Sequence, residues 1–565
     1  MKVAEAVTTI LELEGITDAF GIPGAGINPV YMYLEKSSIH HYCMRHEEAC
    51  AHAADAYYRA SHRLAVALCT SGPGATNFVT GLYTAKIDSI PFLAITGQAN
   101  SWQLGMEPFQ CVDIAEICKT VAKKTYQVLD PSSIVSVMRE AFSLMRSGRP
   151  GPVLIDLPLD VQMKEIAFDP AQYTPLPVYR QPADPGLFKA AADLLKNAEK
   201  PVIIMGGGVI LAECEKQLVA LAERKAIPVI TTYMAKGGIP QNHPLNAGHA
   251  GIQVGQPLGN RVLLDSDVVL AIGCRFGDRH TGNLQVYRGE RKFIHIDIDA
   301  EQIGRVFAPD LGIVCDAKQA VSALDSALET LKPFSLERVA QIAVWRRELE
   351  RKTNYESTPI MPHRLFQEIN EAFDDDTMYC VGCGNTQIWS GQLQTINAPM
   401  RYLPSGGAGT LGYEIPALFG AKVADPEHYA VSIVGDFGFT FLGEEIAVAA
   451  VYHKPLIIVI LNNANLGLIR QNQKGAYQFI YGVDMPYNQD GRVDYIKVAQ
   501  GFGCKAERVY SPKELRMALE RAKAASDEGR TYVIDAICVK EQLCDMGSSI
   551  DAIKCWAPSD THIAQ

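Results

Sequence analysis

The sequence lacks the features that mark membrane, secreted and nucleic-acid-binding proteins. No apolar run approaches the roughly 20 residues needed to cross a bilayer. The N-terminal segment carries Glu5, Glu12 and Glu14 in a helical pattern and has no signal-peptide core. The formal net charge is −11 and Lys and Arg are scattered, so no basic patch for nucleic acid or an anionic membrane is expected. These absences predict a cytoplasmic protein with neither kind of partner.

The cysteines lack the spacing of a disulfide framework or a zinc site. Most of the 14 lie inside apolar segments, which predicts reduced core residues. Cys380-Val-Gly-Cys383 has no second CxxC or spaced His pair with it, so a turn after a strand is favoured over zinc binding. His46-Glu47-x-x-Cys50 lacks the second His that a zinc-protease helix needs.

The chain also lacks short repeats and low-complexity segments, whereas alternation of strand-like and helix-like segments recurs three times. At 565 residues it is too long for one core. We predict an α/β fold of three doubly wound parallel-sheet domains, at residues 1–168, 186–332 and 360–539. A Pro-rich stretch (169–185) and a polar stretch (333–362) are the expected linkers. Residues 540–565 form a tail that could act as a lid or simply dock.

The most informative stretch is 429–467. Tyr429–Val434 and Pro455–Leu461 are apolar, β-branched runs typical of strands buried on both faces, and the segment between them has helical spacing. A right-handed crossover would make these strands parallel, so Asp436 and Asn463 would emerge at the same edge of the sheet. Carboxylate, amide and backbone carbonyl oxygens suit Mg²⁺. The alternative is an ordinary helix cap and turn.

Two glycine-rich segments suggest phosphate binding. PVIIMGGGVI (201–210) is a strand running into three glycines, which alone is a weak nucleotide signal. Gly407-x-Gly409-x-x-Gly412 formally satisfies a dinucleotide fingerprint. Its expected acidic ribose partner is replaced by Gly435-Asp436 and the downstream asparagines, which disfavours a dinucleotide enzyme.

The motifs resemble those of thiamine diphosphate (ThDP) enzymes of the acetolactate synthase branch. The resemblance rests on the Gly-Asp to Asn-Asn spacing, LNNANLGLIRQ (461–471) and RHEEACAHAADAYYRA (45–60), and it extends over essentially the whole chain. It implies pyrimidine-binding, central FAD-type and diphosphate-binding domains, with ThDP, Mg²⁺ and a structural FAD as cofactors. It also implies a homodimer or homotetramer with active sites at the subunit interface.

The resemblance assigns roles around ThDP. Glu47 would share a proton with N1′ of the pyrimidine and so promote loss of the C2 proton. Metal ligands would be Asp436, Asn463 and the carbonyl of Asn465. The Gly409 carbonyl would accept from the 4′-amino group, and Leu411 would bend the cofactor. Further cofactor contacts are assigned to Gly384, Asn385, Gly435, Phe437, Gly438, Leu466 and Gly467. The substrate pocket is assigned to Gln110, Leu468 and Ile469.

The resemblance also implies a flavin site after the buried strands of the central domain. Arg275 and Arg279 suit diphosphate recognition, and Asp297 and Asp316 suit ribose or adenosine hydroxyls. The other assigned residues are Gly206, Gly207, Gly208, Thr232, Tyr233, Gly273, Ile298 and Ala317. Surface ion pairing is the alternative for the charged residues, and some relatives keep a degenerate site without flavin.

Several local phrases, among them FQCVDIAEICK, RFGDRHTG and DMGSSID, most resemble glyoxylate carboligases. This implies a carboxy-lyase that joins two glyoxylates into tartronate semialdehyde and CO₂. Asn472 stands where acetolactate synthases usually carry Trp, which argues against that activity.

Two departures from the family pattern leave alternatives open. Phe437 is bulkier than the Gly or Ala of many relatives, and Glu47 stands where glyoxylate carboligases carry an aliphatic residue. One alternative is an acetolactate synthase-like enzyme that uses pyruvate or another 2-oxoacid. Another is a non-catalytic regulatory protein that binds flavin or ThDP, since fold does not fix function.

Overall fold

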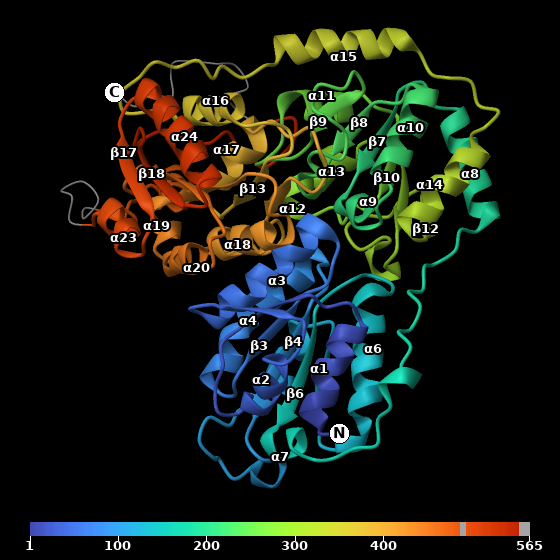
Figure 1. Ribbon diagram of the computed structural model, residues 1–565. Helices are drawn as coiled ribbons and strands as arrows, with labels where there is room; N and C mark the ends of the chain where they lie inside the picture. Colours follow the sequence, from blue (N-terminus) through green and yellow to red (C-terminus); the bar gives the residue numbers. More distant parts are fainter. Residues whose placement is uncertain (486–492, 553–565) are drawn as a thin grey trace.

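The computed structural model describes residues 1–485 and 493–552 and contains three α/β units, each built on its own sheet (Figure 1). Each sheet has six strands, and the strands named below pair only in parallel. The predicted fold class is therefore confirmed. Parallel pairing needs a crossover between successive strands, which explains why helices cover both faces.

The first sheet has the order β2-β1-β3-β4-β6-β5. Its strands are β1 (Asp18–Gly21), β2 (His40–Cys43), β3 (Val66–Cys69), β4 (Leu93–Gln98), β5 (Lys124–Gln127) and β6 (Val153–Pro158). Its helices are α1 (Val3–Leu13), α2 (Asn28–Leu34), α3 (Glu47–Ser61), α4 (Pro73–Asp88), α5 (Ile114–Ile117), α6 (Ile134–Arg146) and α7 (Leu159–Gln162).

The central sheet has the order β12-β11-β10-β7-β8-β9, in which the first strand along the chain lies in the middle, as in nucleotide-binding α/β folds. Its strands are β7 (Pro201–Met205), β8 (Val229–Thr231), β9 (Asn246–His249), β10 (Val268–Ile272), β11 (Lys292–Asp297) and β12 (Leu311–Val314). Its helices are α8 (Pro185–Lys196), α9 (Gly207–Leu211), α10 (Glu215–Lys225), α11 (Pro257–Leu264), α12 (Asp278–Thr281), α13 (Leu284–Arg288) and α14 (Ala317–Ala327).

The third sheet, β14-β13-β15-β16-β18-β17, repeats the relative strand order of the first. Its strands are β13 (Met378–Val381), β14 (Tyr402–Pro404), β15 (Ala430–Gly435), β16 (Ile457–Asn462), β17 (Lys505–Val509) and β18 (Tyr532–Ile537). Its helices are α16 (Pro362–Ala372), α17 (Asn385–Leu393), α18 (Glu414–Ala424), α19 (Asp436–Phe439), α20 (Ile446–Val451), α21 (Gly467–Asn472), α23 (Tyr495–Gly501) and α24 (Pro512–Asp527).

The polar stretch 333–362, predicted as a linker, contains a helix that the sequence did not predict, α15 (Leu336–Glu348). The Ser335 side chain accepts a hydrogen bond from the backbone N–H of Glu337 and so caps the helix, and Ile342 is buried in the central core. A single fully buried residue leaves almost no hydrophobic periodicity to detect.

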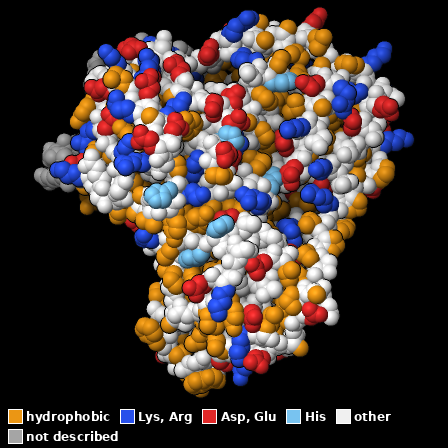
Figure 2. Space-filling view, viewed as in Figure 1, with side chains coloured by type: hydrophobic (Ala, Val, Ile, Leu, Met, Phe, Trp, Pro, Cys, Tyr) orange, Lys and Arg blue, Asp and Glu red, His pale blue; other side chains and the backbone are white. Residues whose placement is uncertain are grey.

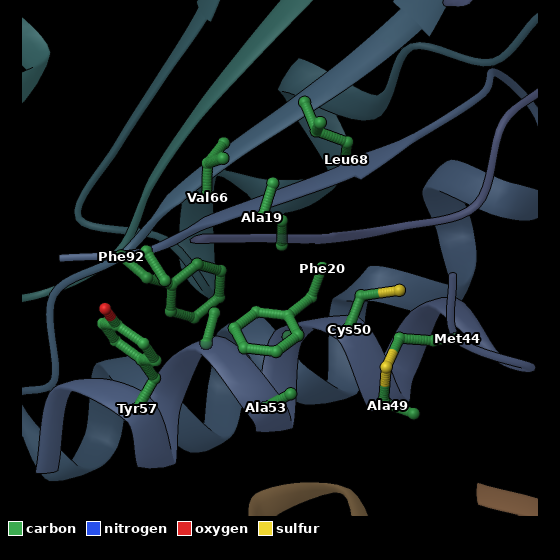
Figure 3. Close-up of a cluster of buried hydrophobic side chains, with 14 of the residues drawn as sticks. Ala19, Phe20, Met44, Ala49, Cys50, Ala53, Tyr57, Val66, Leu68 and Phe92 are labelled. Carbon is green, nitrogen blue, oxygen red and sulfur yellow. The ribbon is translucent and has the colours of Figure 1, made fainter. Parts of the chain in front are cut away.

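The first and third units meet through α3 and α18, which lie side by side in Figure 1. The contact is so close that a Cβ on Gly420 would overlap the carbonyl group of Ala53. On its other side, α3 packs through Cys50, Ala53 and Tyr57 against a buried cluster that includes Phe20 of β1 (Figure 3). This packing fixes α3, whose first residue is Glu47.

The surface charges and the cysteines of the described residues agree with what the composition predicts. Positive and negative side chains are interspersed on the face in Figure 2. All 13 cysteines among the described residues are free, and 10 of them are buried. Among residues 1–485 and 493–552, no helix combines the length and hydropathy that crossing a membrane requires.

Candidate functional site

The third sheet forms a crevice at the carboxyl ends of β13, β15 and β16. The chain leaves β13 toward β14 on one side, whereas β15 and β16 lie on the other side, so β13 and β15 flank a topological switch point. Ligands of open α/β sheets bind at such points. The segment predicted from sequence, including Asp436 and Asn463, lies at this edge.

Asp436 is 1% exposed and is held rigidly at the end of β15. Its Oδ1 accepts a hydrogen bond from the N–H of Phe437 (2.8 Å) and its Oδ2 accepts one from the N–H of Ala464 (2.7 Å). Ala464 has a φ of 57°, a left-handed conformation that turns the chain sharply after β16. The turn thus brings the Asn463–Asn465 segment against Asp436.

The amide side chains of the site converge on one glycine. A Cβ on Gly467 would lie 2.6 Å from Asn385 Nδ2 and 3.1 Å from Asn463 Nδ2. The Oδ1 atoms of Asn385 and Asn465 are buried and have no hydrogen-bond partner among the described residues. Buried acceptors without partners are costly in a folded protein, so these atoms fit a ligand that supplies cations or donors.

Two predicted cofactor glycines face open space. A Cβ on Gly384 or Gly435 would meet nothing within 4 Å, and Gly384 has a φ of 104°. Gly409 has a φ of 62°, and a Cβ there would meet only Cys383 Sγ, at 3.4 Å. Leu411 is partly buried two residues further on. Phe437, the bulky departure from the family pattern, packs its ring against Phe441 (centroids 5.4 Å apart).

The pocket residues predicted on α21 differ in exposure. Leu468 packs against the core of the third unit, whereas Ile469 is 50% exposed. Leu466 is the N-cap residue of this helix, and its N–H donates to the Val483 carbonyl (2.8 Å). The tail crosses beside them, since Asn465 Nδ2 donates to the Lys540 carbonyl (3.2 Å).

The rest of the described tail runs from the third unit to the central one. Gly547 N–H donates to the Ile252 carbonyl (3.0 Å), and Asn283 N–H donates to the Ser548 carbonyl (2.9 Å). The predicted lid covers residues 540–565, of which 553–565 lie outside the described residues.

The first unit presents a second group of predicted residues at the end of β3. Glu47 Oε2 accepts a hydrogen bond from Asn77 Nδ2 (2.9 Å), and a Cβ on Gly74 would lie 3.1 Å from Glu47 Oε1. Gln110, in the segment after β4, has a φ of 55° and packs its backbone against Gly72, in the loop between β3 and α4. Glu48 points elsewhere, since its Oε1 lies 3.2 Å from His52 Nε2.

In the central unit the three glycines approach the next strand end. A Cβ on Gly206 would overlap the Gly273 carbonyl, and one on Gly208 would lie 2.8 Å from Gly273 Cα. Gly207 packs on Met234 instead. Gly273 is left-handed, with a φ of 61°. Thr232 donates its N–H to the Met205 carbonyl (2.9 Å) and so anchors the next loop.

The charged residues predicted for a flavin fall into two groups. Arg275 is partly buried and has no hydrogen bond or ion pair with the described residues, and its Nη2 lies 2.9 Å from where a Cβ on Gly407 would be. Burial raises the pKa of Asp297 to about 6. In contrast, Asp316 caps α14 and pairs with Arg180 (2.9 Å).

The remaining flavin candidates also have protein contacts. Arg279 is exposed beside Asp278 (3.9 Å), and Tyr233 accepts a hydrogen bond from the Tyr402 hydroxyl (3.2 Å). Ile298 follows β11, and Ala317 begins α14. Among the predicted flavin residues, the glycine loop, Arg275 and Asp297 are therefore the ones whose surroundings fit an anionic dinucleotide.

Three family models match the chain in order. They are the N-terminal TPP binding domain (residues 1–117), the central domain (188–324) and the C-terminal TPP binding domain (382–536) of thiamine pyrophosphate enzymes. The chain belongs to the thiamine pyrophosphate enzyme family. The resemblance inferred from sequence is thereby confirmed, and both ThDP-binding domains are present.

This ThDP enzyme is similar to relatives of two kinds. Glyoxylate carboligase of Escherichia coli O157:H7 is 44% identical, with 98% of this chain and 96% of the relative covered. A probable acetolactate synthase large subunit of Methanocaldococcus jannaschii is 38% identical (95% and 92% covered), as is the acetolactate synthase large subunit of Corynebacterium glutamicum (95% and 87% covered).

The ThDP fold also explains the formal dinucleotide fingerprint. The loop containing Gly407-x-Gly409-x-x-Gly412 follows β14, which is the edge strand of the third sheet. A dinucleotide-binding loop follows the central strand at the switch point. In the central sheet the glycine loop 206–208 does follow the central strand β7, whereas the glycine loop of the third sheet follows an edge strand.

Two buried carboxyl groups near the site, those of Glu414 and Glu445, were not predicted from the sequence. Glu414 begins α18 and is 1% exposed; Glu445 is fully buried and contacts the first unit. Both stand in apolar stretches, PSGGAGTLGYEIPALFGA and LGEEIAVAA, which was the one signal available. Neither stretch indicates which loops the carboxyl groups reach.

Proposed function

We propose that this ThDP enzyme is a decarboxylating carboligase that joins two glyoxylates. Two glyoxylate anions and one proton give one tartronate semialdehyde anion and one CO₂. The observation that carries the proposal is the 44% identity to a glyoxylate carboligase over nearly the full length of both chains, against 38% for the acetolactate synthases.

The third unit would bind the diphosphate and Mg²⁺. Asp436, Asn463 and the Asn465 carbonyl supply the hard oxygen atoms that Mg²⁺ prefers, and the unpartnered Asn465 Oδ1 lies in the same turn. The open faces of Gly384 and Gly435 would let the backbone approach the diphosphate closely. When bound, ThDP supplies an electron sink for the carbanion equivalent that decarboxylation creates.

The first unit would handle the proton at N1′. Asn77 orients Glu47 by donating to Oε2, while Oε1 remains beside Gly74. A carboxylate fixed in this way can share a proton with a ring nitrogen. Gln110 lies beside the same loop and, with Ile469, would shape the pocket for a 2-oxoacid.

Glu47 and Gly409, the residues predicted to contact opposite sides of the pyrimidine ring, lie far apart within one chain. Glu47 contacts the start of α4, whereas Thr410, next to Gly409, hydrogen-bonds Thr84 near the other end (2.7 Å). Gly74 and Thr84 are 10 residues apart, about 15 Å along a helix at 1.5 Å per residue. Partners on opposite sides of one pyrimidine ring lie within about 10 Å, from two hydrogen bonds plus the ring. We therefore propose that a second copy of the chain completes each site.

Exposed apolar residues near these groups support a homodimer or homotetramer. Trp102, Met106 and Phe109 are 65%, 71% and 88% exposed in the segment before Gln110. Tyr477 and Tyr481 are 68% and 83% exposed after α21. Large apolar side chains gathered beside a site are typical of a protein interface.

FAD is proposed as a structural ligand of the central unit. The central strand order and the glycine loop support it, as does Arg275, which has no ion pair among the described residues. Protein purified without added flavin should show flavin absorbance, and Arg275→Ala should retain less flavin than Arg279→Ala, because Arg279 is exposed. A flavin-free wild-type preparation that cannot be reconstituted would contradict this part of the proposal.

A second candidate is an acetolactate synthase-like reaction on pyruvate. The 38% identity to two such subunits over 95% of the chain favours it, as does Glu47, which the resemblance to glyoxylate carboligases did not predict. Asn472, in place of the usual Trp, opposes it.

A substrate comparison tests the proposal. Purified protein with ThDP and Mg²⁺ would receive glyoxylate, pyruvate or both, with CO₂ release followed and products identified by mass spectrometry. We expect tartronate semialdehyde from glyoxylate alone. Acetolactate from pyruvate alone would favour the second candidate, and cofactor binding without CO₂ release would favour a non-catalytic binding protein.

A further inference from the structure

A buried carboxyl group lies at the switch point of the third sheet without a partner. Glu414 is 1% exposed, and neither carboxyl oxygen has a hydrogen-bond partner among the described residues. No ion pair of the described residues includes it either. An isolated buried carboxylate is costly, so the group must be neutral or must meet a ligand.

The surrounding glycines show where the group points. A Cβ on Gly382, just after β13, would overlap the Glu414 carboxyl group, and a Cβ on Gly438, in α19, would lie 3.0 Å from Oε1. The carboxyl group therefore lies between the ends of β13 and β15. Gly384 and Gly435, whose outer faces are open, belong to the same two loops.

The position of the carboxyl group favours the diphosphate over the metal as its ligand. Asp436 follows β15, and Asn463 and Asn465 follow β16, so the candidate metal residues lie toward the β15–β16 side of the site. The Glu414 carboxyl group lies instead between the ends of β13 and β15, against Gly382 and Gly438. The loops of Gly384 and Gly435, which border the same two strand ends, would hold the diphosphate there.

An ionised Glu414 carboxylate beside the diphosphate would repel it. A protonated carboxyl group would instead donate its O–H to a phosphate oxygen, a short and strong kind of hydrogen bond. We propose that Glu414 is an additional cofactor-binding residue, which binds the ThDP diphosphate as a neutral acid and takes up a proton to do so. This inference rests on the proposed function.

The titration of the group agrees with this geometry. Burial raises the pKa of Glu414 to about 7, and the nearby backbone N–H groups of Glu414 and Gly412, whose geometry falls short of a hydrogen bond, oppose that rise only in part. Among the described residues, the titratable side chains with a resolved electrostatic interaction with Glu414 are Cys380, on β13, and Cys383, in the loop that follows. The carboxylate charge helps to raise the pKa of both thiols, which leaves them neutral.

The test is the ThDP dissociation constant of the apoprotein as a function of pH, with saturating Mg²⁺, measured by calorimetry for wild type and Glu414→Gln. The ratio of the two constants removes the titration of ThDP itself. We expect the wild-type constant to rise relative to that of Glu414→Gln by about tenfold per pH unit above pH 7. Glu414→Ala, which also removes the acid, should abolish the same pH dependence.

The control is Glu445→Gln, a second buried acid of the third unit, whose Oε1 accepts N–H groups of the first unit. It should retain the wild-type pH dependence. A ratio of ThDP dissociation constants between wild type and both Glu414 variants that does not change with pH would overturn the inference. Weaker Mg²⁺ binding by Glu414→Gln would also overturn it, because Glu414 would then be a metal ligand. Failure of the wild type to bind ThDP would instead contradict the proposed function.

Discussion

Glu445 in the third unit accepts a hydrogen bond from the backbone N–H of His46 in the first unit (2.9 Å), and the same oxygen accepts one from Arg45 (3.0 Å). His46 is the N-cap of α3, so this carboxyl group fixes the turn that presents Glu47. Burial raises the pKa of Glu445 to about 8, opposed by the two N–H groups. A positioning role follows, because Glu445 acts through the backbone next to Glu47.

Glu445→Ala should therefore lower kcat by about tenfold, because the turn that presents Glu47 loses its acceptor; a tenfold loss corresponds to about 1.4 kcal/mol of activation free energy. Glu445→Gln keeps an acceptor oxygen and should restore most of the activity. Steady-state kinetics of both variants check this. Equal losses in Ala and Gln would show that the charge, and not the acceptor, is what matters.

Glu47→Gln should reduce kcat by roughly 100-fold or more, since general acid–base groups contribute about 10²–10⁴. Asn77 can still hydrogen-bond the amide oxygen, so the fold around α3 should persist. The matched control is Glu48→Gln, because Glu48 contacts His52 instead. Unchanged turnover in Glu47→Gln would remove Glu47 from the chemistry.

Subunit mixing tests whether a second copy completes the site. Glu47→Gln and Asp436→Asn should each be inactive as pure proteins. After unfolding and refolding together in equal amounts, half of the dimers would be mixed, and one of their two sites would have both wild-type residues. Activity should recover to about a quarter of wild type for a twofold symmetric dimer. No recovery, with mixed dimers demonstrated, would place both residues in one chain's site.

The raised pKa of Glu414 also predicts how the stability of the apoprotein varies with pH. Its folded pKa of about 7 lies above the ordinary value of 4.5, so its contribution to folding is present below pH 4.5 and is lost as the pH rises through 7. The Tm of Glu414→Gln minus that of wild type should thus increase from pH 5 to about pH 7.5 and then level off. A difference independent of pH would show that Glu414 titrates normally.

Much of the fold could be predicted because the strands are buried on both faces. Runs such as 430–435 and 457–462 have no polar alternation, and the helix-length segments between them require parallel pairing. That pairing also placed Asp436 and Asn463 at one edge. α15 was missed because Ile342 is its one fully buried residue.

The parts of the site that could not be predicted depend on packing between distant segments. Glu414 reaches Gly382 and Gly438, and Glu445 reaches His46 of another unit; no local pattern encodes either contact. The turn at Ala464, which brings Asn465 onto the Asp436 loop, likewise needs a left-handed conformation, and the sequence gives no sign of it because the residue there is alanine and not glycine.

The most direct test of the central claim uses glyoxylate labelled with ¹³C at both carbons as the sole substrate, with ThDP and Mg²⁺, followed by ¹³C NMR. The account predicts a product with three contiguous labelled carbons, an aldehyde, a carbinol and a carboxylate, together with one labelled CO₂ for every two glyoxylates consumed. Unchanged glyoxylate, under conditions in which pyruvate alone yields acetolactate, would contradict it.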